Sequence, residues 1–162
     1  MIITNPNTTN FEKSVNKIIH DTNEWFNTNL SLNLGKMHFI QFVTKNSSSN
    51  DLNIMHENRK IPNIYNTKFL GLMLGNTLSW KTHIDTILPK LSSASFALRV
   101  VKPFLSQDSL TMVYYSYFHS VMTYRLIFWG NSHHSNVIFR LQKRIIRIIV
   151  GIRGRDSCRE HF

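Results

Sequence analysis

Four basic side chains near the end of the sequence recur at the spacing of an α-helix. They stand at positions i, i+3, i+4 and i+7 and are Arg140, Lys143, Arg144 and Arg147. This spacing places them on one helix face, because neighbours on a face are three and four residues apart. The apolar stripe beside them consists of Leu141, Ile145, Ile148 and Ile149. The pattern predicts a helix that docks through one side and presents four cations on another.

A helix face with four cations and no acid is typical of proteins that bind nucleic acid. Its contacts would go to phosphates without reading bases, and they would weaken steeply with salt. The further arginines Arg153, Arg155 and Arg159 extend the positive surface. The formal net charge is +10, and residues 61–162 hold thirteen basic residues against four acidic ones. Two other interpretations stay open: a solvated face that keeps a helical bundle soluble, and a helix lying on a membrane surface.

The nine acidic residues show no arrangement that would hold catalytic metal ions. Two-metal phosphoryl transfer needs several converging carboxylates, yet no two acidic residues are adjacent in the sequence. Asp21 and Glu24 share a face of a predicted helix, which a solvated surface explains more simply. His133 and His134 are the only adjacent histidines, and no cysteine–histidine set has zinc-ligand spacing. The sequence therefore predicts no metal site and no complete active site.

The elements that must position these residues begin with one helix and several extended segments. Apolar residues near a 3.6-residue period predict a helix over about 9–27, with Thr9 and Glu12 at the spacing of a capping box. Gly35 is predicted to turn the chain between two strands. The extended segments, in chain order, are residues 30–36, 37–43, 52–55, 60–64 and 68–74.

After Ser79 the pattern becomes helical. The predicted helices span about 80–101, 107–128 and 133–150. Pro89 should kink or break the first of them, because proline lacks a backbone donor and clashes with the preceding turn. Ser106 or Asp108 can cap the second, and Gly151 can end the third. The fold class is therefore α+β: a small mixed part followed by an all-helical part, with the boundary near residues 75–80.

Cys158 is the only cysteine, so no disulfide can form within the chain. This usage suits a reducing compartment, and an intracellular location in nucleus or cytoplasm is expected. No run reaches the roughly 20 apolar residues that a membrane span needs. The first residues lack the basic and apolar regions of a secretion signal.

Several short motifs, taken in order, resemble the reverse transcriptases of LINE-type retrotransposons of the jockey-like kind. The matching segments are 25–36 (ending Asn-Leu-Gly-Lys), 69–74 (Phe-Leu-Gly-Leu-Met-Leu), 78–84 with Ser-Trp, 120–130 ending Trp-Gly, and 142–162 beginning Gln-Lys-Arg. Each motif is weak alone, but their order and spacing are specific. The resemblance extends over nearly the whole chain.

The resemblance implies that the chain is a fragment of an RNA-directed DNA polymerase, a nucleotidyltransferase. Residues 1–77 would form the C-terminal part of the polymerase palm, with a helix and short antiparallel hairpins, and residues 78–162 a thumb-like helical bundle. In relatives the aspartates that bind Mg²⁺ lie upstream of the segment that Ile2–Asn5 resembles. Those aspartates, the N-terminal palm and the fingers are therefore expected to be missing. The chain alone should bind no Mg²⁺ and should not polymerise DNA.

The same resemblance gives two residues a role. Lys36 matches a lysine implicated in protonating the pyrophosphate leaving group, although a turn lysine would look the same. Gly71 lies in the segment that resembles the primer grip, where it would allow close approach of a primer strand; a bulge glycine in a buried strand is the alternative. Met37, Gly75 and Arg125 differ from the residues usual in this family. Such departures suit a decaying copy of the retrotransposon. The alternatives are a non-catalytic nucleic-acid-binding remnant and a pseudogene product with no selected function.

Overall fold

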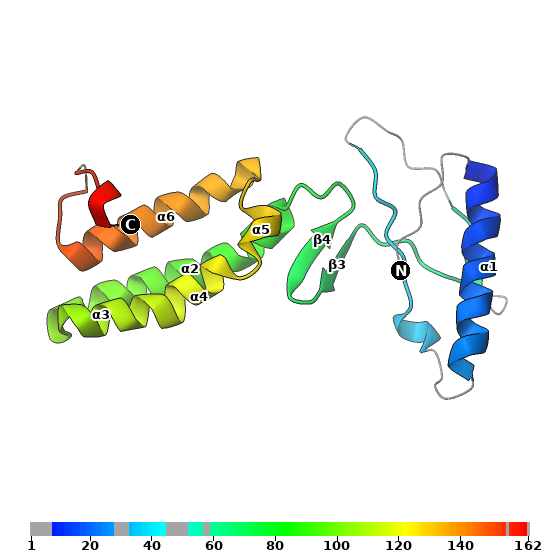
Figure 1. Cartoon of the computed structure of the whole chain (residues 1–162), viewed down its shortest axis with the longest axis horizontal. Helices are drawn as coiled ribbons and strands as arrows, with labels where there is room; N and C mark the ends of the chain where they lie inside the picture. The colour runs from blue at the N-terminus through cyan, green and yellow to red at the C-terminus, as the bar shows by residue number, and fades with distance from the viewer. Residues whose placement is uncertain (1–7, 28–32, 45–51, 57–58, 155, 162) are drawn as a thin grey trace. The chain divides into compact units, whose positions relative to one another are not determined.

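The computed structural model describes residues 8–27, 33–44, 52–56, 59–154 and 156–161. They belong to two compact units, an N-terminal unit (Met1–Thr67) and a helical unit (Lys68–Phe162) (Figure 1). The chain is helix-rich with two small antiparallel hairpins, so the predicted α+β class is confirmed. The sequence predicted a division after residue 77. The structure divides after Thr67, because strand β4 (Leu72–Gly75) packs against helix α2 (Lys81–Val101) of the helical unit.

The N-terminal unit is built on helix α1 (Thr8–Asn27). The buried side of this helix packs against a small apolar core. That core contains Val15, Ile19, Leu52, Ile54 and Ile61. Polar side chains on α1 also bind the facing segment, since Asn53 N–H donates to Glu12 Oε1 (2.9 Å) and Met55 N–H to Asn16 Oδ1 (3.2 Å). Glu12 thus accepts from a distant backbone amide, where the sequence had suggested a capping box.

The extended segments of this unit pair only briefly. Strands β1 (Met55–His56) and β2 (Arg59–Lys60) lie where the predicted extended segments 52–55 and 60–64 approach each other, and they pair in antiparallel register. The predicted hairpin about Gly35 is not found among the described residues: Leu34–Lys36 is a 3₁₀ turn, named η1, and Phe39 beyond it forms a parallel bridge with Asn63. Residues 28–32 lie outside the described part of the chain.

The segment predicted as a single strand over 68–74 is in fact a hairpin. Strand β3 (Asn66–Phe69) turns at Leu70 and Gly71 into β4. Both turn residues have positive φ, 47° and 83°, which is the backbone twist that a tight two-residue hairpin requires. The sequence did not predict this turn, because the residues around it are apolar and leucine is uncommon at positive φ.

Helix α2 is the centre of the helical unit. Its inward face is apolar at a helical period and includes Ile84, Ile87, Leu91, Ala94 and Leu98. Pro89 was predicted to kink or break this helix; it lies inside α2 and does not break it. Pro89 is exposed, so its ring lies on the solvent side of the helix.

The helix predicted over 107–128 is divided into shorter pieces. Ser106 begins the first piece as an N-cap, with Oγ accepting from Ser109 N–H at 3.3 Å. The pieces are α3 (Gln107–Val113), the π-helix η3 (Tyr114–His119), α4 (Ser120–Thr123) and α5 (Leu126–Trp129). The break before α5 coincides with Arg125, which has a positive φ of 53°. Trp129 Nε1–H donates to Tyr124 O (3.1 Å) and so binds across this break.

The last helix, α6 (Asn136–Val150), follows a 3₁₀ turn, η4 (His133–Ser135). Gly151 ends α6 with a φ of 85°, and its N–H donates to Arg147 O at 2.9 Å. The predicted glycine cap is thus confirmed. The short 3₁₀ turn η5 (Arg159–His161) closes the described chain, and Cys158 just before it is buried. No helix within the described ranges combines the length and apolarity that a membrane crossing needs.

Phe118 and Phe104 allow a matched test of this core. Phe118 is fully buried in the helical unit, whereas Phe104 is 84% exposed. Phe118→Ala should lower the free energy of unfolding by about 3–5 kcal/mol, since it removes packed apolar surface and leaves a cavity. Phe104→Ala should change it by less than about 0.5 kcal/mol. Denaturant titration followed by tryptophan fluorescence measures both, and equal losses would contradict this core assignment.

His83 links the folding of this unit to pH. Its ring is buried beside Trp129, with centroids 6.0 Å apart, and its Nδ1 accepts from Met73 N–H at 3.4 Å. Burial lowers the pKa of the imidazole below its ordinary value. The neutral form therefore stabilises the fold above the unfolded pKa of about 6.5, and this contribution is lost as pH falls through and below that value.

His83→Leu should remove this pH dependence. We expect the difference in free energy of unfolding between wild type and variant to shrink as pH falls from about 8 to 5. Denaturant titrations at several pH values measure this difference. The contributions of the other histidines cancel in it, because both proteins contain them. A difference that stays constant across this range would show that the His83 ring is not held in the neutral form.

Candidate nucleic-acid interface

Helix α6 separates its apolar and basic residues onto opposite sides. Ile138, Ile145 and Ile149 are buried in the core of the helical unit, which α6 shares with α2. With about 100° between successive residues, the four predicted cations point away from that core. We name Arg140, Lys143, Arg144 and Arg147 the basic face. The first three are exposed and Arg147 is half-buried, so the structure brings the four together as predicted.

A hydrogen bond from the end of α2 also holds the C-terminal end of α6 in place. The Lys102 ammonium, at the end of α2, donates to the carbonyl of Ile148 in the last turn of α6. A cation there also interacts favourably with the negative end of the helix dipole. Lys102 is thus engaged by the fold, whereas Arg140, Lys143 and Arg144 of the basic face are exposed to solvent.

No carboxylate neutralises the basic face within the described residues. The one ion pair found among them joins His20 to Glu24 on α1, far along the sequence. The nearest acid in sequence, Asp156, receives Arg153 N–H on its carboxylate at 3.1 Å. An array of exposed cations without counter-charges is an electrostatic surface for a polyanion.

The arginines beyond α6 are only partly assembled with it. Arg147 Nε–H donates to Asp156 O at 3.0 Å, which ties the C-terminal segment to the last turns of the helix. Arg153 and Arg159 are exposed on that segment. Arg155, the remaining predicted contact, lies outside the described residues.

Lys36 ends the 3₁₀ turn η1 in the N-terminal unit and is exposed. Its carbonyl accepts a hydrogen bond from the His38 ring at 3.0 Å, and its N–H donates to Asn33 O at 3.0 Å. These bonds order the backbone and leave the ammonium in solvent. The backbone arrangement is that of a lysine in a turn.

Gly71 occupies the β3–β4 turn, so the predicted strand bulge is wrong. A Cβ on this residue would lie 3.1 Å from the ring of Tyr124, whose hydroxyl donates to Leu70 O at 2.8 Å. The space next to Gly71 is thus occupied by a tyrosine of the same unit. The glycine permits the turn and the close approach of Tyr124, rather than the approach of a separate strand on that side.

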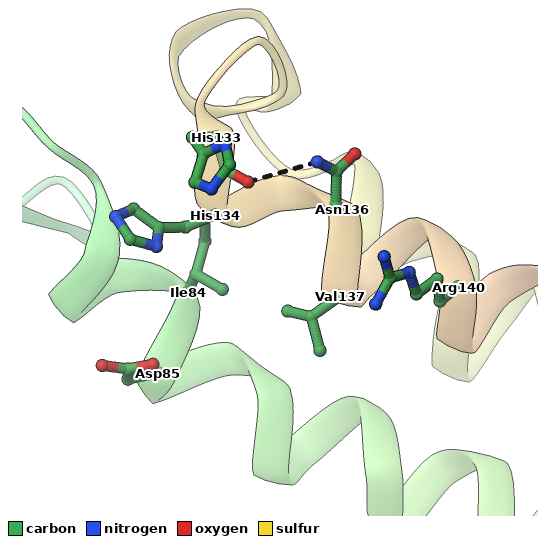
Figure 2. Close-up of a pocket in the computed structure, with 7 residues that line it drawn as sticks. All are labelled: Ile84, Asp85, His133, His134, Asn136, Val137 and Arg140. Atoms are coloured by element: carbon green, nitrogen blue, oxygen red, sulfur yellow. Dashed lines mark hydrogen bonds between the residues drawn. The ribbon is translucent and has the colours of Figure 1, made fainter.

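Sequence reasoning missed a surface pocket of about 310 Å³ at the start of α6 (Figure 2). It is lined by Ile84, Asp85, His133, His134, Asn136, Val137 and Arg140. The adjacent histidines His133 and His134 were the only signal of this pocket in the sequence. Because Asp85 comes from α2, only the packing of α2 against α6 brings it to the same pocket.

Among the described residues, no group of three or more histidine, cysteine or acidic side chains could hold a metal ion. No family model, curated protein or solved structure matches this chain. A function for the described surface must therefore be inferred from the residues of this chain. Cations dominate it, and they suit binding of phosphates.

Gly71→Ala tests the interpretation of this turn. The substitution places a Cβ at positive φ and against Tyr124, so we expect a loss of about 1–2 kcal/mol in the free energy of unfolding. Gly154→Ala is the control, because nothing lies within 4 Å of a Cβ there and its φ is not in the left-handed range. It should change stability by less than about 1 kcal/mol. A neutral Gly71→Ala in thermal or denaturant unfolding would contradict the turn geometry.

Proposed function

We propose that this chain binds the phosphate backbone of a nucleic-acid duplex, as the thumb-bearing fragment of a LINE-type reverse transcriptase would bind primer and template. The observation that carries this proposal is the basic face of α6. Its cations lie on the side of α6 opposite the buried isoleucines, and Arg140, Lys143 and Arg144 are exposed there. They also have no carboxylate partner among the residues that the structure describes.

The dimensions of the basic face suit a nucleic-acid backbone. Arg140 and Arg147 are seven residues apart, which corresponds to about 10 Å along a helix. One strand of a duplex carries about three phosphates over that length of its axis. Because a helix carries them, the arginine and lysine side chains can contact successive phosphates without the ordering of a flexible loop.

The resemblance to LINE-type reverse transcriptases supports the choice of partner. Its motifs run in the family's order, and its last block begins at Gln142-Lys143-Arg144, within the basic face. The proposed role is to hold a primer–template duplex while chemistry occurs elsewhere. The two-metal polymerase reaction of the family needs Mg²⁺ on aspartates, and we assign none of this chain's residues to that step.

The basic face can be tested by removing its charges. Arg140, Lys143, Arg144 and Arg147 together changed to alanine should weaken duplex binding at every sequence tested. The slope of log K against log salt should become less steep by about three to four, because close to one counterion is released for each phosphate that a basic side chain neutralises. Fluorescence anisotropy with labelled RNA–DNA duplexes across salt concentrations measures both quantities.

A second quadruple variant controls for net charge. Lys13, Lys17, Lys81 and Lys90 are exposed on α1 and α2, and changing them to alanine removes the same four charges. This variant should keep most of the salt slope. If the two variants weaken binding equally, or if wild type does not bind a duplex at low salt, the basic face is not the interface.

A further inference from the structure

We infer that the pocket at the start of α6 holds one unpaired base of a nucleic-acid strand and favours cytosine over uracil. The inference rests on the proposed function, since the strand would lie on the basic face. It adds a discriminating site to a surface that otherwise contacts only phosphates. The two can fail separately, because phosphate binding does not depend on base identity.

The pocket joins the two helices that shape the helical unit. In the view of Figure 2, Asp85 stands on α2 and Arg140 on α6, with Ile84 and Val137 between them. His133 and His134 close the side nearest the 3₁₀ turn η4. Its volume of about 310 Å³ is at the lower limit for small-ligand sites, which is the scale of a single nucleotide rather than a larger cofactor.

The two charged residues of the pocket are available to a ligand. Asp85 and Arg140 both line it, yet no ion pair joins them within 4.0 Å, nor does either pair with another described residue. The Asn136 amide is oriented by donating to His133 O at 3.3 Å, as the dashed line in Figure 2 shows. A carboxylate and a guanidinium left unneutralised on facing helices suit a ligand with hydrogen-bond donors at one end and a negative charge at the other.

A nucleotide in a single strand has this combination. Its phosphate can accept from Arg140, while the exposed side chain of Val137 offers an apolar surface to the base. Unpaired bases are commonly recognised by stacking on histidine or arginine planes together with hydrogen bonds to the base edge. His134, which is half-buried in the pocket wall, provides such a ring.

Asp85 determines which base is preferred. A carboxylate only accepts hydrogen bonds, so it selects a base edge that donates. Cytosine has an amino group at its 4-position, and aspartate accepts from that group in direct readout. Uracil has the same size but a carbonyl oxygen at that position, which an unpaired carboxylate repels. The two pyrimidines therefore isolate the contribution of Asp85 from size and stacking.

Arg140 makes the pocket continuous with the basic face. It lines the pocket and also begins the row that continues through Lys143, Arg144 and Arg147. A strand whose phosphates follow this row passes the pocket opening at its Arg140 end. The base attached there can enter the pocket only if it is unpaired, which places the preference at a single-stranded position next to a duplex.

The test compares fluorescein-labelled oligocytidine and oligouridine of equal length, titrated with the full chain at constant salt and neutral pH. We expect oligocytidine to bind roughly tenfold more tightly. Asp85→Asn should reduce this preference to about twofold or less, because an amide can donate to the uracil oxygen. Asp108→Asn, an exposed carboxylate at the start of α3, is the matched control and should leave the preference unchanged.

Three outcomes overturn the inference. Equal binding of both oligonucleotides, with a steep salt dependence, would reject the pocket and leave the proposed function standing. A cytosine preference that survives Asp85→Asn, in a variant whose circular dichroism matches wild type, would place the preference elsewhere. Absence of binding to oligonucleotides and duplex alike would reject the proposed function and this inference with it.

Discussion

Burial of one face of α2 is the constraint on which the helical unit depends. Helix α2 contacts α6, α3 and strand β4, so its apolar residues bind the unit together. Because Leu91 and Leu98 are fully buried in this packing, α6 must bring its isoleucines to the same core. Its cations then have only the solvent side to occupy. The basic face is therefore a consequence of core packing, and it needs no separate stabilisation.

Features set by local periodicity were predictable, and features set by tertiary hydrogen bonds were not. Apolar spacing predicted α1, α2 and α6 almost to their ends, since an amphipathic face depends only on the sequence within it. The β3–β4 turn was missed because Leu70 is held there by the hydroxyl of Tyr124, more than fifty residues away. The break before α5 was missed for a similar reason: Trp129 donates to the Tyr124 carbonyl across a break that contains no glycine or proline.

The same division applies to the candidate sites. The four cations of α6 could be found because they share one helix, and their helical spacing determines the face. The pocket could not, because Asp85 and Arg140 become neighbours only when α2 and α6 pack. The roles expected for Lys36 and Gly71 came from the family resemblance. In the structure both residues lie in turns.

Several residues of the helical unit have a strained backbone that tertiary contacts must stabilise. All the non-glycine residues with positive φ in the described ranges belong to this unit; they are Leu70, Leu78, Trp80 and Arg125. Such conformations cost about 1–3 kcal/mol each and persist only where surrounding contacts enforce them. Trp80 immediately precedes α2, and its ring lies 6.4 Å from the rings of both His83 and Phe128. These contacts hold the first turn of α2, and they thereby position Ile84 and, just after it, Asp85 in the wall of the pocket.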